Sequence, residues 1–564
     1  MTPTDSAGYA SAWHAAVDFL QASGVETVFG LPDDDLVPLK ALEPTDVRMV
    51  LCRDQRAAAF MAAGHALRSG QTAVCVIGKG PAAANVVGGL VEARCSGAPM
   101  VVLASGTSAS ARGSGAFQEL DQMAMLSPVV KWAHRVDHPD RVVPAIERAF
   151  LVAANGAPGP VYLEFSADLL EAEVVRGRPW RLPRTHRPTP DGPALETSLA
   201  ALRASRRPVL LVGGGMRHRN ADGQVERLAE RLGAAIFVTA TGRGSVDEDH
   251  PLFCGLAGLY APEESHPLWA GTDLVVALGS RLEETATYRP GFAGPGTDVL
   301  QVNLEPAEVS AEWGGPVVIG DGGAAVRAWL AGLAEEGNGA DPEWADSVRS
   351  CHSRSAGRVA AERRRVAELP GIHIAEVLYV LDEVLPAKRI LVQENGLQDM
   401  WSYFYPFWSC GASADSIVPS EQTSLGFGAV AAAGVKLAAP DHAVAAFVGD
   451  GAFGKLGADL DVLVDEGIGV LYIVLDNGGY GWLQAQLDKG GAGSSRFRFV
   501  REPAAAGDGR PGPYHAVVDD RVGLKKELWQ AAQESAAGRV AVVWIPVRLE
   551  DVPADLTEME GQHS

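Results

Sequence analysis

Two polar residues in the last third of the chain each follow a short apolar run. Asp450 comes after residues 443–448, and Asn477 comes after residues 470–475. Apolar positions between them recur at helical spacing, so we expect a strand, a helix and a second, parallel strand. The carboxyl ends of both strands would meet at one edge of a sheet. There Asp450, Asn477 and the backbone carbonyl of Gly479 offer the oxygen ligands that Mg²⁺ prefers.

Small residues around Asp450 predict that this metal would hold a diphosphate. Gly449 and Gly451 let a ligand approach the backbone, and Ala452 continues the turn. We expect a helix through residues 453–464, whose first N–H groups would attract phosphate. Mg²⁺ commonly completes its octahedron with phosphate oxygens and water. The alternative is an incidental aspartate at a strand–turn–helix junction, which the second polar segment disfavours.

Apolar runs along the whole chain predict the elements that position these residues. Short runs alternate with longer amphipathic stretches, as in α/β proteins with parallel sheets. Residues 176–193 are rich in Pro and Arg, and residues 334–342 are polar, so both are predicted linkers. We therefore expect three tandem parallel-sheet α/β domains, over residues 1–175, 194–334 and 365–550. The predicted elements are a helix over 82–93 and strands over 74–77, 100–103, 208–212, 235–238, 274–278, 299–302, 390–392, 444–448, 470–475 and 540–545.

Composition narrows the class of protein. The chain has 564 residues and a formal net charge of −22, which argues against nucleic acid or an anionic membrane as a partner. Its six cysteines form no CxxC pair, so a zinc site or disulfide framework is not expected. The opening residues lack signal-peptide features, and no apolar run is long enough to span a bilayer. We expect a cytoplasmic protein.

The metal segment resembles that of the thiamine-diphosphate-dependent enzyme superfamily, in its acetolactate synthase-like and benzoylformate decarboxylase-like branch. In that family Gly-Asp-Gly, a spacer of this length and a pair of asparagines hold Mg²⁺ and thiamine diphosphate. The second asparagine is the metal ligand, which is Asn477 here, while Asp476 replaces the first. The resemblance covers nearly the whole chain. It implies pyrimidine-binding, central and diphosphate-binding domains, in that order.

The resemblance also assigns roles in the first domain. Asp54 stands where the family has a glutamate that hydrogen-bonds the aminopyrimidine ring, and it is shorter by roughly 1.5 Å. An ordinary charged residue at a helix start is the alternative for Asp54. Gln118, in Ala-Phe-Gln-Glu, is a candidate contact for cofactor-bound substrate, or else a surface amide beside a buried Phe117. Lys79 replaces a small hydroxyl residue before Gly80.

Two further positions in the third domain carry implied roles. Gln398 lies in a segment that contacts diphosphate in the family, where Leu397 replaces a polar residue. Leu425 would wedge beneath the cofactor and enforce its bent conformation, with simple core packing as the alternative. In the central domain, FAD binding is disfavoured, because Glu283 and Glu284 follow Arg281-Leu282 where FAD-binding relatives often carry two aspartates.

These features predict a thiamine-diphosphate-dependent carboligase. It would decarboxylate a 2-oxo acid, with pyruvate as one candidate, and add the resulting carbanion to a second carbonyl compound. The alternatives are a simple 2-oxo acid decarboxylase and a cofactor-binding relative with little turnover. The resemblance further implies a homodimer or homotetramer with sites at the subunit interface. Residues 33–35, all Asp, are predicted to form a solvated acidic turn, and residues 484–513 are predicted to form a lid.

Overall fold

The structure is a computed structural model of the chain. It describes residues 7–32, 36–182, 184–288, 292–334, 340–404, 407–411, 413–489, 512–518, 520–548 and 551–553. The acidic turn predicted at 33–35 and most of the predicted lid lie outside the described residues. By contacts, the chain forms two compact units. The first comprises Met1–His186, Gln422–Pro440 and Leu456–Ile468, and the second comprises Arg187–Glu421, Asp441–Lys455 and Gly469–Ser564.

The first unit contains a parallel six-stranded sheet. Its strands, in spatial order, are β3 (Arg48–Leu51), β2 (Thr27–Leu31), β4 (Ala73–Ile77), β5 (Met100–Gly106), β7 (Pro160–Ser166) and β6 (Trp132–Val136). The four inner strands are largely apolar and mostly buried, as expected for a sheet covered on both faces, whereas the edge strands β3 and β6 each have one buried residue. A separate antiparallel pair joins β1 (Ala7–Tyr9) to β8 (Val174–Arg176).

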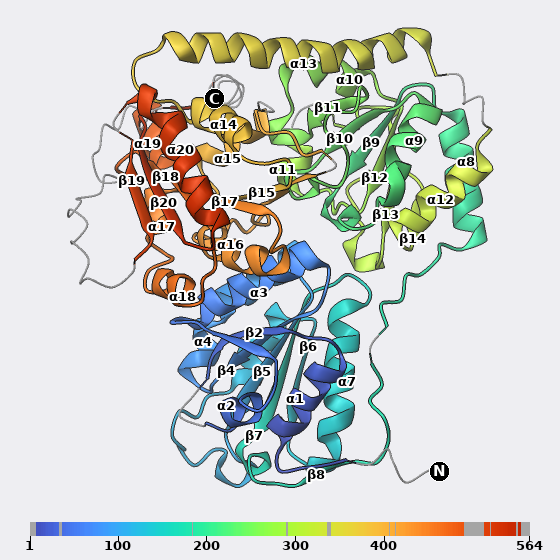
Figure 1. The fold of residues 1–564 in the computed structure, drawn as a ribbon. Helices are drawn as coiled ribbons and strands as arrows, with labels where there is room; N and C mark the ends of the chain where they lie inside the picture. The colour runs from blue at the N-terminus through green and yellow to red at the C-terminus, as the bar shows by residue number, and fades with distance from the viewer. Residues whose placement is uncertain are drawn as a thin grey trace. The chain divides into compact units, whose positions relative to one another are not determined.

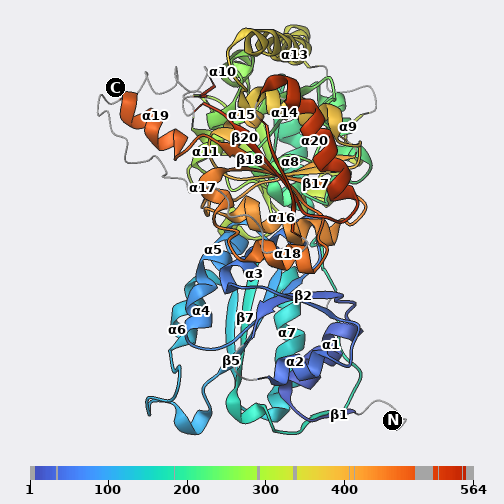
Figure 2. The same ribbon diagram turned by 60° about the vertical axis from the view of Figure 1, so that its left-hand side comes forward.

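Helices cover both faces of this sheet. Figure 2 shows α1, α2 and α7 on one side and α4, α5 and α6 on the other. The helices are α1 (Ala12–Ala22), α2 (Val37–Leu42), α3 (Gln55–Ser69), α4 (Pro81–Asn85), α5 (Val87–Ser96), α6 (Gln122–Leu126) and α7 (Val142–Ala154).

Helix α16 (Phe427–Ala438) packs directly on α3 within the first unit, and Figures 1 and 2 show the two side by side. Glycines permit this close approach. A Cβ on Gly64 would lie 2.4 Å from the carbonyl oxygen of Ala431, and one on Gly434 would lie 1.7 Å from that of Met61. The contact therefore requires residues without a side chain at both positions. Helix α18 (Asp459–Asp465) belongs to the same unit.

The second unit holds two further parallel six-stranded sheets. The central sheet has the order β11 (Phe253–Leu256), β10 (Ala235–Val238), β9 (Pro208–Val212), β12 (Leu274–Leu278), β13 (Asp298–Asn303) and β14 (Val317–Ile319). The C-terminal sheet has the order β16 (Ala414–Ile417), β15 (Arg389–Gln393), β17 (Ala443–Gly449), β18 (Leu471–Asp476), β20 (Ala541–Pro546) and β19 (Tyr514–Val517).

The long helix α13 (Pro342–Glu368) runs past both sheets of the second unit, as Figure 1 shows. The other α-helices of this unit are α8 (Gly192–Ala204), α9 (Gln224–Leu232), α10 (His266–Gly271), α11 (Glu284–Thr287), α12 (Gly322–Gly332), α14 (Ile374–Val384), α15 (Leu397–Phe404), α17 (Asp450–Phe453), α19 (Gly481–Lys489) and α20 (Arg521–Ala536). No helix in the described part of the chain is both long and apolar enough to cross a bilayer.

The architecture confirms the predicted class of three tandem parallel-sheet α/β domains. All ten predicted strands exist, with ends within a few residues of those expected. Two predicted helices are wrong as continuous elements. The helix over 82–93 is divided at Val86 into α4 and α5, and the helix over 453–464 is divided into α17 and α18.

Candidate cofactor site

The structure brings the two predicted metal segments together at one edge of the C-terminal sheet. Strands β17 and β18 are parallel neighbours, with Gly449 opposite Leu475. Asp450 therefore lies just past the end of one strand, beside the turn that follows the other. Its Oδ1 accepts a hydrogen bond from the N–H of Gly451 at 2.8 Å, and its Oδ2 accepts one from the N–H of Gly478 at 3.0 Å.

Asn477 organises the second segment by a local turn. Its Oδ1 accepts a hydrogen bond from the N–H of Gly479 at 3.1 Å, and Gly478 between them has φ of 73°. This left-handed conformation favours glycine. The Asx turn explains why a short polar side chain is followed here by two glycines.

The donor set fits a magnesium ion only if a phosphate completes it. Among the described residues, no group of three His, Cys, Asp or Glu side chains is placed to hold a metal ion. Asp450, Asn477 and the Gly479 carbonyl would supply one carboxylate and two neutral oxygens. Mg²⁺ requires six ligands, so water and diphosphate oxygens must provide the remainder. Metal and diphosphate should therefore bind together.

Gln398 lies beside the glycine that precedes Asp450. Its side chain is buried, and its Nε2 donates to the carbonyl oxygen of Glu394 at 2.9 Å. Its Oε1 lies 4.0 Å from the position that a Cβ on Gly449 would occupy. The absence of a side chain at Gly449 leaves the backbone turn open next to a polar group, which suits a phosphate-binding position.

Asp399, adjacent to Gln398, was not among the predicted site residues. It is buried and accepts a hydrogen bond from the N–H of Gly396 at 3.1 Å. Burial, reinforced by the charge of nearby Glu394, raises the pKa of the Asp399 carboxyl well above its usual range. Burial thus opposes ionisation of this carboxyl. The position of Asp399 at the start of a helix, after a buried strand, is the sequence signal that could have identified this residue.

The helix after Asp450 is shorter than expected. Helix α17 ends at Phe453, and the chain resumes helical structure only in α18. Gly454 and Gly457 lie in the interval, and Gly457 has φ of 51°. Glycine lowers helix stability, so the helix breaks here. The apolar periodicity of the sequence nevertheless continues across the break. Ala452 is buried within the single turn that α17 provides.

In the first unit, Asp54 is the N-cap of α3. Its Oδ1 accepts hydrogen bonds from the N–H groups of Arg56 at 2.9 Å and Ala57 at 3.2 Å. Its side chain is 43% exposed. Asp54 thus performs the structural role that we weighed as the alternative to cofactor activation, and one oxygen is committed to the helix start.

Gln118 has two features typical of a functional residue. Its backbone is left-handed, with φ of 56°, which is unfavourable for a residue with a side chain. Its Oε1 is buried and accepts no hydrogen bond from any described residue. Buried polar atoms without partners are uncommon and need an explanation, such as a ligand. Phe117 next to it is 70% exposed, which contradicts the alternative of a surface amide beside a buried Phe117.

Leu425 is 38% exposed and precedes α16 in the first unit. Simple core packing, which was the alternative role for Leu425, therefore does not explain this exposure. Gly426 follows as the N-cap of α16, with φ of 97°. Leu425 is held in a glycine-containing turn with its side chain available for contact.

The glycines of the central domain have a structural explanation. A Cβ on Gly213 would lie 2.4 Å from the carbonyl oxygen of Gly279, and one on Gly215 would lie 2.9 Å from the Cα of Gly279. Arg281 pairs with Glu283 at 3.0 Å and with Glu308 at 3.6 Å. These contacts give a structural reason for both sequence features.

Comparison with known proteins identifies the class. Three family models match the chain: the N-terminal TPP binding domain of thiamine pyrophosphate enzymes at residues 11–125, their central domain at 195–328, and their C-terminal TPP binding domain at 396–535. Together these cover more than two-thirds of the chain. The protein therefore belongs to the thiamine pyrophosphate enzymes, and the predicted cofactor, thiamine diphosphate, is confirmed at the level of the family.

Relatives within this class are similar to the chain over most of its length. The chain is 27% identical to the probable acetolactate synthase large subunit of Methanocaldococcus jannaschii, over 82% of this chain and 79% of that protein. It is 28% identical to the acetolactate synthase large subunit of Corynebacterium glutamicum, over 83% and 75%. It is also 28% identical to the acetolactate synthase isozyme 2 large subunit of Escherichia coli, over 82% of both chains.

Proposed function

We propose that the protein is a thiamine-diphosphate-dependent carboligase that decarboxylates a 2-oxo acid and joins the remaining fragment to a second carbonyl compound. Pyruvate is the first donor to test, because the relatives are named acetolactate synthases. When bound, thiamine diphosphate supplies the nucleophilic carbon and the electron sink for this chemistry. The protein supplies binding, orientation and exclusion of water.

One observation carries the proposal: the strand ends after β17 and β18 join Asp450 to the Asn477 turn. In this proposal Asp450, Asn477 and the Gly479 carbonyl bind Mg²⁺. Gly449, Gly451, Ala452 and Gln398 surround the diphosphate. Leu425 supports the cofactor, and Gln118 contacts the substrate.

The proposal predicts that Mg²⁺ and thiamine diphosphate bind only together. Calorimetry should detect cofactor binding in the presence of Mg²⁺ and lose it when a chelator is added. Asp450→Asn should weaken this binding by at least about 10-fold, because it removes the one carboxylate that the protein supplies to the metal in this proposal. Asp461→Asn, which changes an exposed carboxylate of α18, is the matched control and should bind normally. Cofactor binding that is indifferent to Mg²⁺ would exclude the assignment.

Products decide between the enzymatic alternatives. Incubation with pyruvate and aldehyde or 2-oxo acid acceptors, followed by mass spectrometry, should yield CO₂ and a chiral hydroxy ketone. Aldehyde and CO₂ alone would instead indicate a simple decarboxylase.

The second candidate, a cofactor-binding relative with little turnover, is favoured by one specific observation. Asp54 is shorter than the family glutamate and caps α3 with its carboxylate. Binding of thiamine diphosphate without product from any 2-oxo acid would establish that candidate.

We further propose a homodimer or homotetramer in the cytosol. The exposure of Phe117 beside Gln118 supports burial of this loop by a second copy of the chain. All six cysteines are free thiols, which supports a reducing compartment. Analytical ultracentrifugation of the purified protein tests the assembly, and a monomer at micromolar concentration would contradict it.

A further inference from the structure

We propose that Gln122 is a positioning residue for Gln118, acting through the backbone turn at Gly80. This inference rests on the proposed function, in which Gln118 contacts the substrate. Gln122 begins α6, a few residues after Gln118, and its side chain is almost completely buried. None of the roles considered above requires an amide at this position.

The first step of the argument is the contact between Gly80 and Gln118. A Cβ on Gly80 would lie 2.6 Å from the carbonyl oxygen of Gln118 and 2.9 Å from its Cβ. Gly80 itself has φ of 59° and ψ of −110°, a conformation open only to glycine. The Gly80 backbone therefore lies so close to Gln118 that no side chain fits between them. In this proposal, a displacement of Gly80 would remove the surface against which Gln118 is positioned.

The second step is the hydrogen bond that holds Gly80. Its N–H donates to Oε1 of Gln122 at 2.5 Å, and both groups are buried. On the other side, Nε2 of Gln122 donates to the Tyr162 hydroxyl at 2.7 Å and to Oε2 of Glu164 at 2.9 Å. It also lies 3.2 Å from the carbonyl oxygen of Ser105. One amide thus connects the turn to strands β5 and β7.

The third step is the rigidity of that anchor. Glu164 is buried, and Nε of Arg135 donates to its Oε1 at 2.5 Å. The Tyr162 hydroxyl donates to Oε2 of Glu164 at 3.1 Å. Burial and the charge of Glu164 raise the pKa of Tyr162 well above its usual value, so the hydroxyl keeps its proton. The acceptors that face Gln122 are therefore held within the sheet.

Only an amide satisfies both sides of this position. The acceptor must face the N–H of Gly80, and the donor must face Tyr162 and Glu164. A methionine fills the volume but leaves the N–H and the carboxylate without partners. A glutamate keeps the acceptor, but its charge opposes Glu164 until it is protonated.

Hydrogen–deuterium exchange of the full-length protein tests the tether without requiring turnover. In Gln122→Met, peptides covering residues 78–85 and 113–122 should both exchange faster than in the wild type. Gln301→Met is the matched control, because Gln301 is equally buried and bonds through its amide to the backbone of Ser310 in the central domain. It should leave both peptides unchanged. Unchanged exchange of these peptides in Gln122→Met would overturn the inference.

A double-mutant cycle tests whether the tether acts through Gln118. Gln118→Ala and Gln122→Met should each lower kcat by about 100-fold, with little change in KM. The double variant should be no slower than either, because both changes remove the same group from its working position. Multiplied effects in the double variant would overturn the inference.

A second variant covers the case in which Gln122→Met does not fold. The ratio of Gln122→Glu activity to wild-type activity should rise as the pH is lowered from about 8 to about 6. Protonation of the introduced carboxyl restores a donor toward Glu164. A flat ratio over this range would count against the tether. The two proposals can fail separately. If the wild-type protein forms no product from any 2-oxo acid, but Gln122→Met still exchanges faster in both peptides, the proposed function is refuted and the tether stands.

Discussion

At the scale of single residues, Asp54 combines a structural role with a proposed chemical one, and two substitutions separate them. Asparagine is as good an N-cap as aspartate, so Asp54→Asn should retain the bonds to Arg56 and Ala57 and leave the melting temperature unchanged. It cannot accept a proton, so turnover should fall by about 100-fold. Unchanged kcat in this variant would remove Asp54 from the mechanism.

Asp54→Ala provides the complementary measurement. It removes the cap as well as the carboxylate, so it should lower stability by about 1 kcal/mol in addition to the loss of turnover. Comparing melting temperatures of the two variants isolates the contribution of the cap. An alanine variant as stable as wild type would show that the capping bonds contribute nothing in solution.

The relative placement of the predicted metal segments could be inferred from the sequence more readily than the local structure of the site candidates in the first unit. Asp450 and Asn477 could be placed together because parallel strands bring their carboxyl ends to one edge. The left-handed backbone of Gln118 could not be predicted, because it depends on a contact with Gly80 that is distant in sequence. The capping bonds of Asp54 were foreseeable from its place before an Ala-rich helix.

At the scale of elements, strands were predicted closely and helices less so. Buried parallel strands such as Pro208–Val212 are continuous apolar runs, which leave a clear pattern. The breaks that separate α4 from α5 and α17 from α18 leave the apolar periodicity intact, so pattern alone does not reveal them. Short edge strands such as Val317–Ile319, with two exposed residues, carry too little signal.

The packing of α3 and α16 predicts a pH dependence of stability. His65 on α3 is mostly buried, and burial lowers its pKa to about 4 from an ordinary value of 6.5. The unfolded chain therefore binds this proton more readily than the folded one. The contribution of the neutral, buried His65 to the free energy of unfolding is fully present above about pH 6.5. It is lost as the pH falls toward about 4, by about 3 kcal/mol at most.

Thermal unfolding of His65→Leu checks this linkage. The variant cannot be protonated at this position, so its melting temperature should fall less than that of wild type between about pH 7 and about pH 4.5. His138→Leu, which removes an exposed histidine, should retain the wild-type dependence. Parallel acid dependence in His65→Leu and wild type would show that His65 does not control it.

At the scale of the whole molecule, contacts divide the chain differently from composition. Residues 422–440 and 456–468 fall within the predicted third domain, yet they pack with the first unit. Linker composition marks where the chain passes between sheets, but it carries no information on which helix packs on which. The glycines at Gly64 and Gly434 were the available signal, and they can be interpreted only once α3 and α16 are known to meet.

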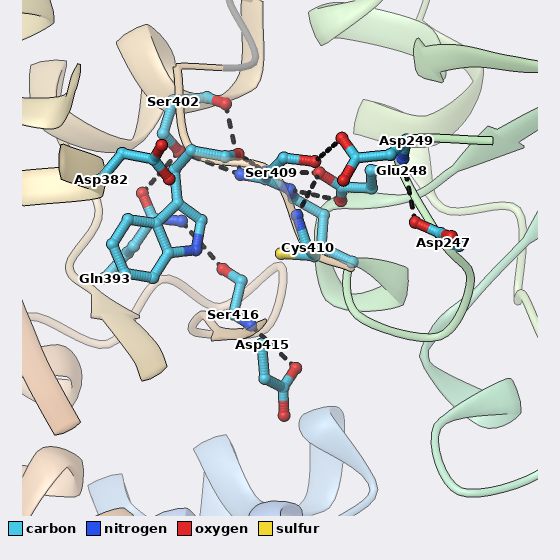
Figure 3. Close-up of polar contacts among 12 residues, drawn as sticks. Asp247, Glu248, Asp249, Asp382, Gln393, Ser402, Ser409, Cys410, Asp415 and Ser416 are labelled. Atoms are coloured by element: carbon cyan, nitrogen blue, oxygen red, sulfur yellow. Dashed lines mark hydrogen bonds and ion pairs between the residues drawn. The ribbon is translucent and has the colours of Figure 1, made fainter. Parts of the chain in front are cut away.

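Within the second unit, a buried ion pair of the central domain makes hydrogen bonds to the C-terminal domain. Arg243 and Glu248 pair at 2.8 Å, with both side chains about 1% exposed. Arg243 also donates to the carbonyl oxygens of Ser402 at 3.2 Å and Trp408 at 2.7 Å. Figure 3 shows Glu248 beside Cys410, whose N–H donates to the carboxylate at 3.1 Å. Burial alone would lower the pKa of Arg243, but the charge of Glu248 raises it, so the guanidinium keeps its charge.

This arrangement predicts strongly non-additive mutations. Arg243→Met leaves the buried Glu248 carboxylate without its counter-ion, and Glu248→Leu leaves the guanidinium in the same state. Each should lower stability by about 3–5 kcal/mol, whereas the double variant should lose less than either single variant. Recovery will be incomplete, because the carbonyl oxygens of Ser402 and Trp408 still lack their donor.

Lys388→Met, which breaks an exposed pair with Asp441, is the control and should change stability by less than about 1 kcal/mol. Melting temperatures of the four variants measure the coupling between Arg243 and Glu248. If the double variant loses as much stability as the two single variants together, the two charges do not act as a pair.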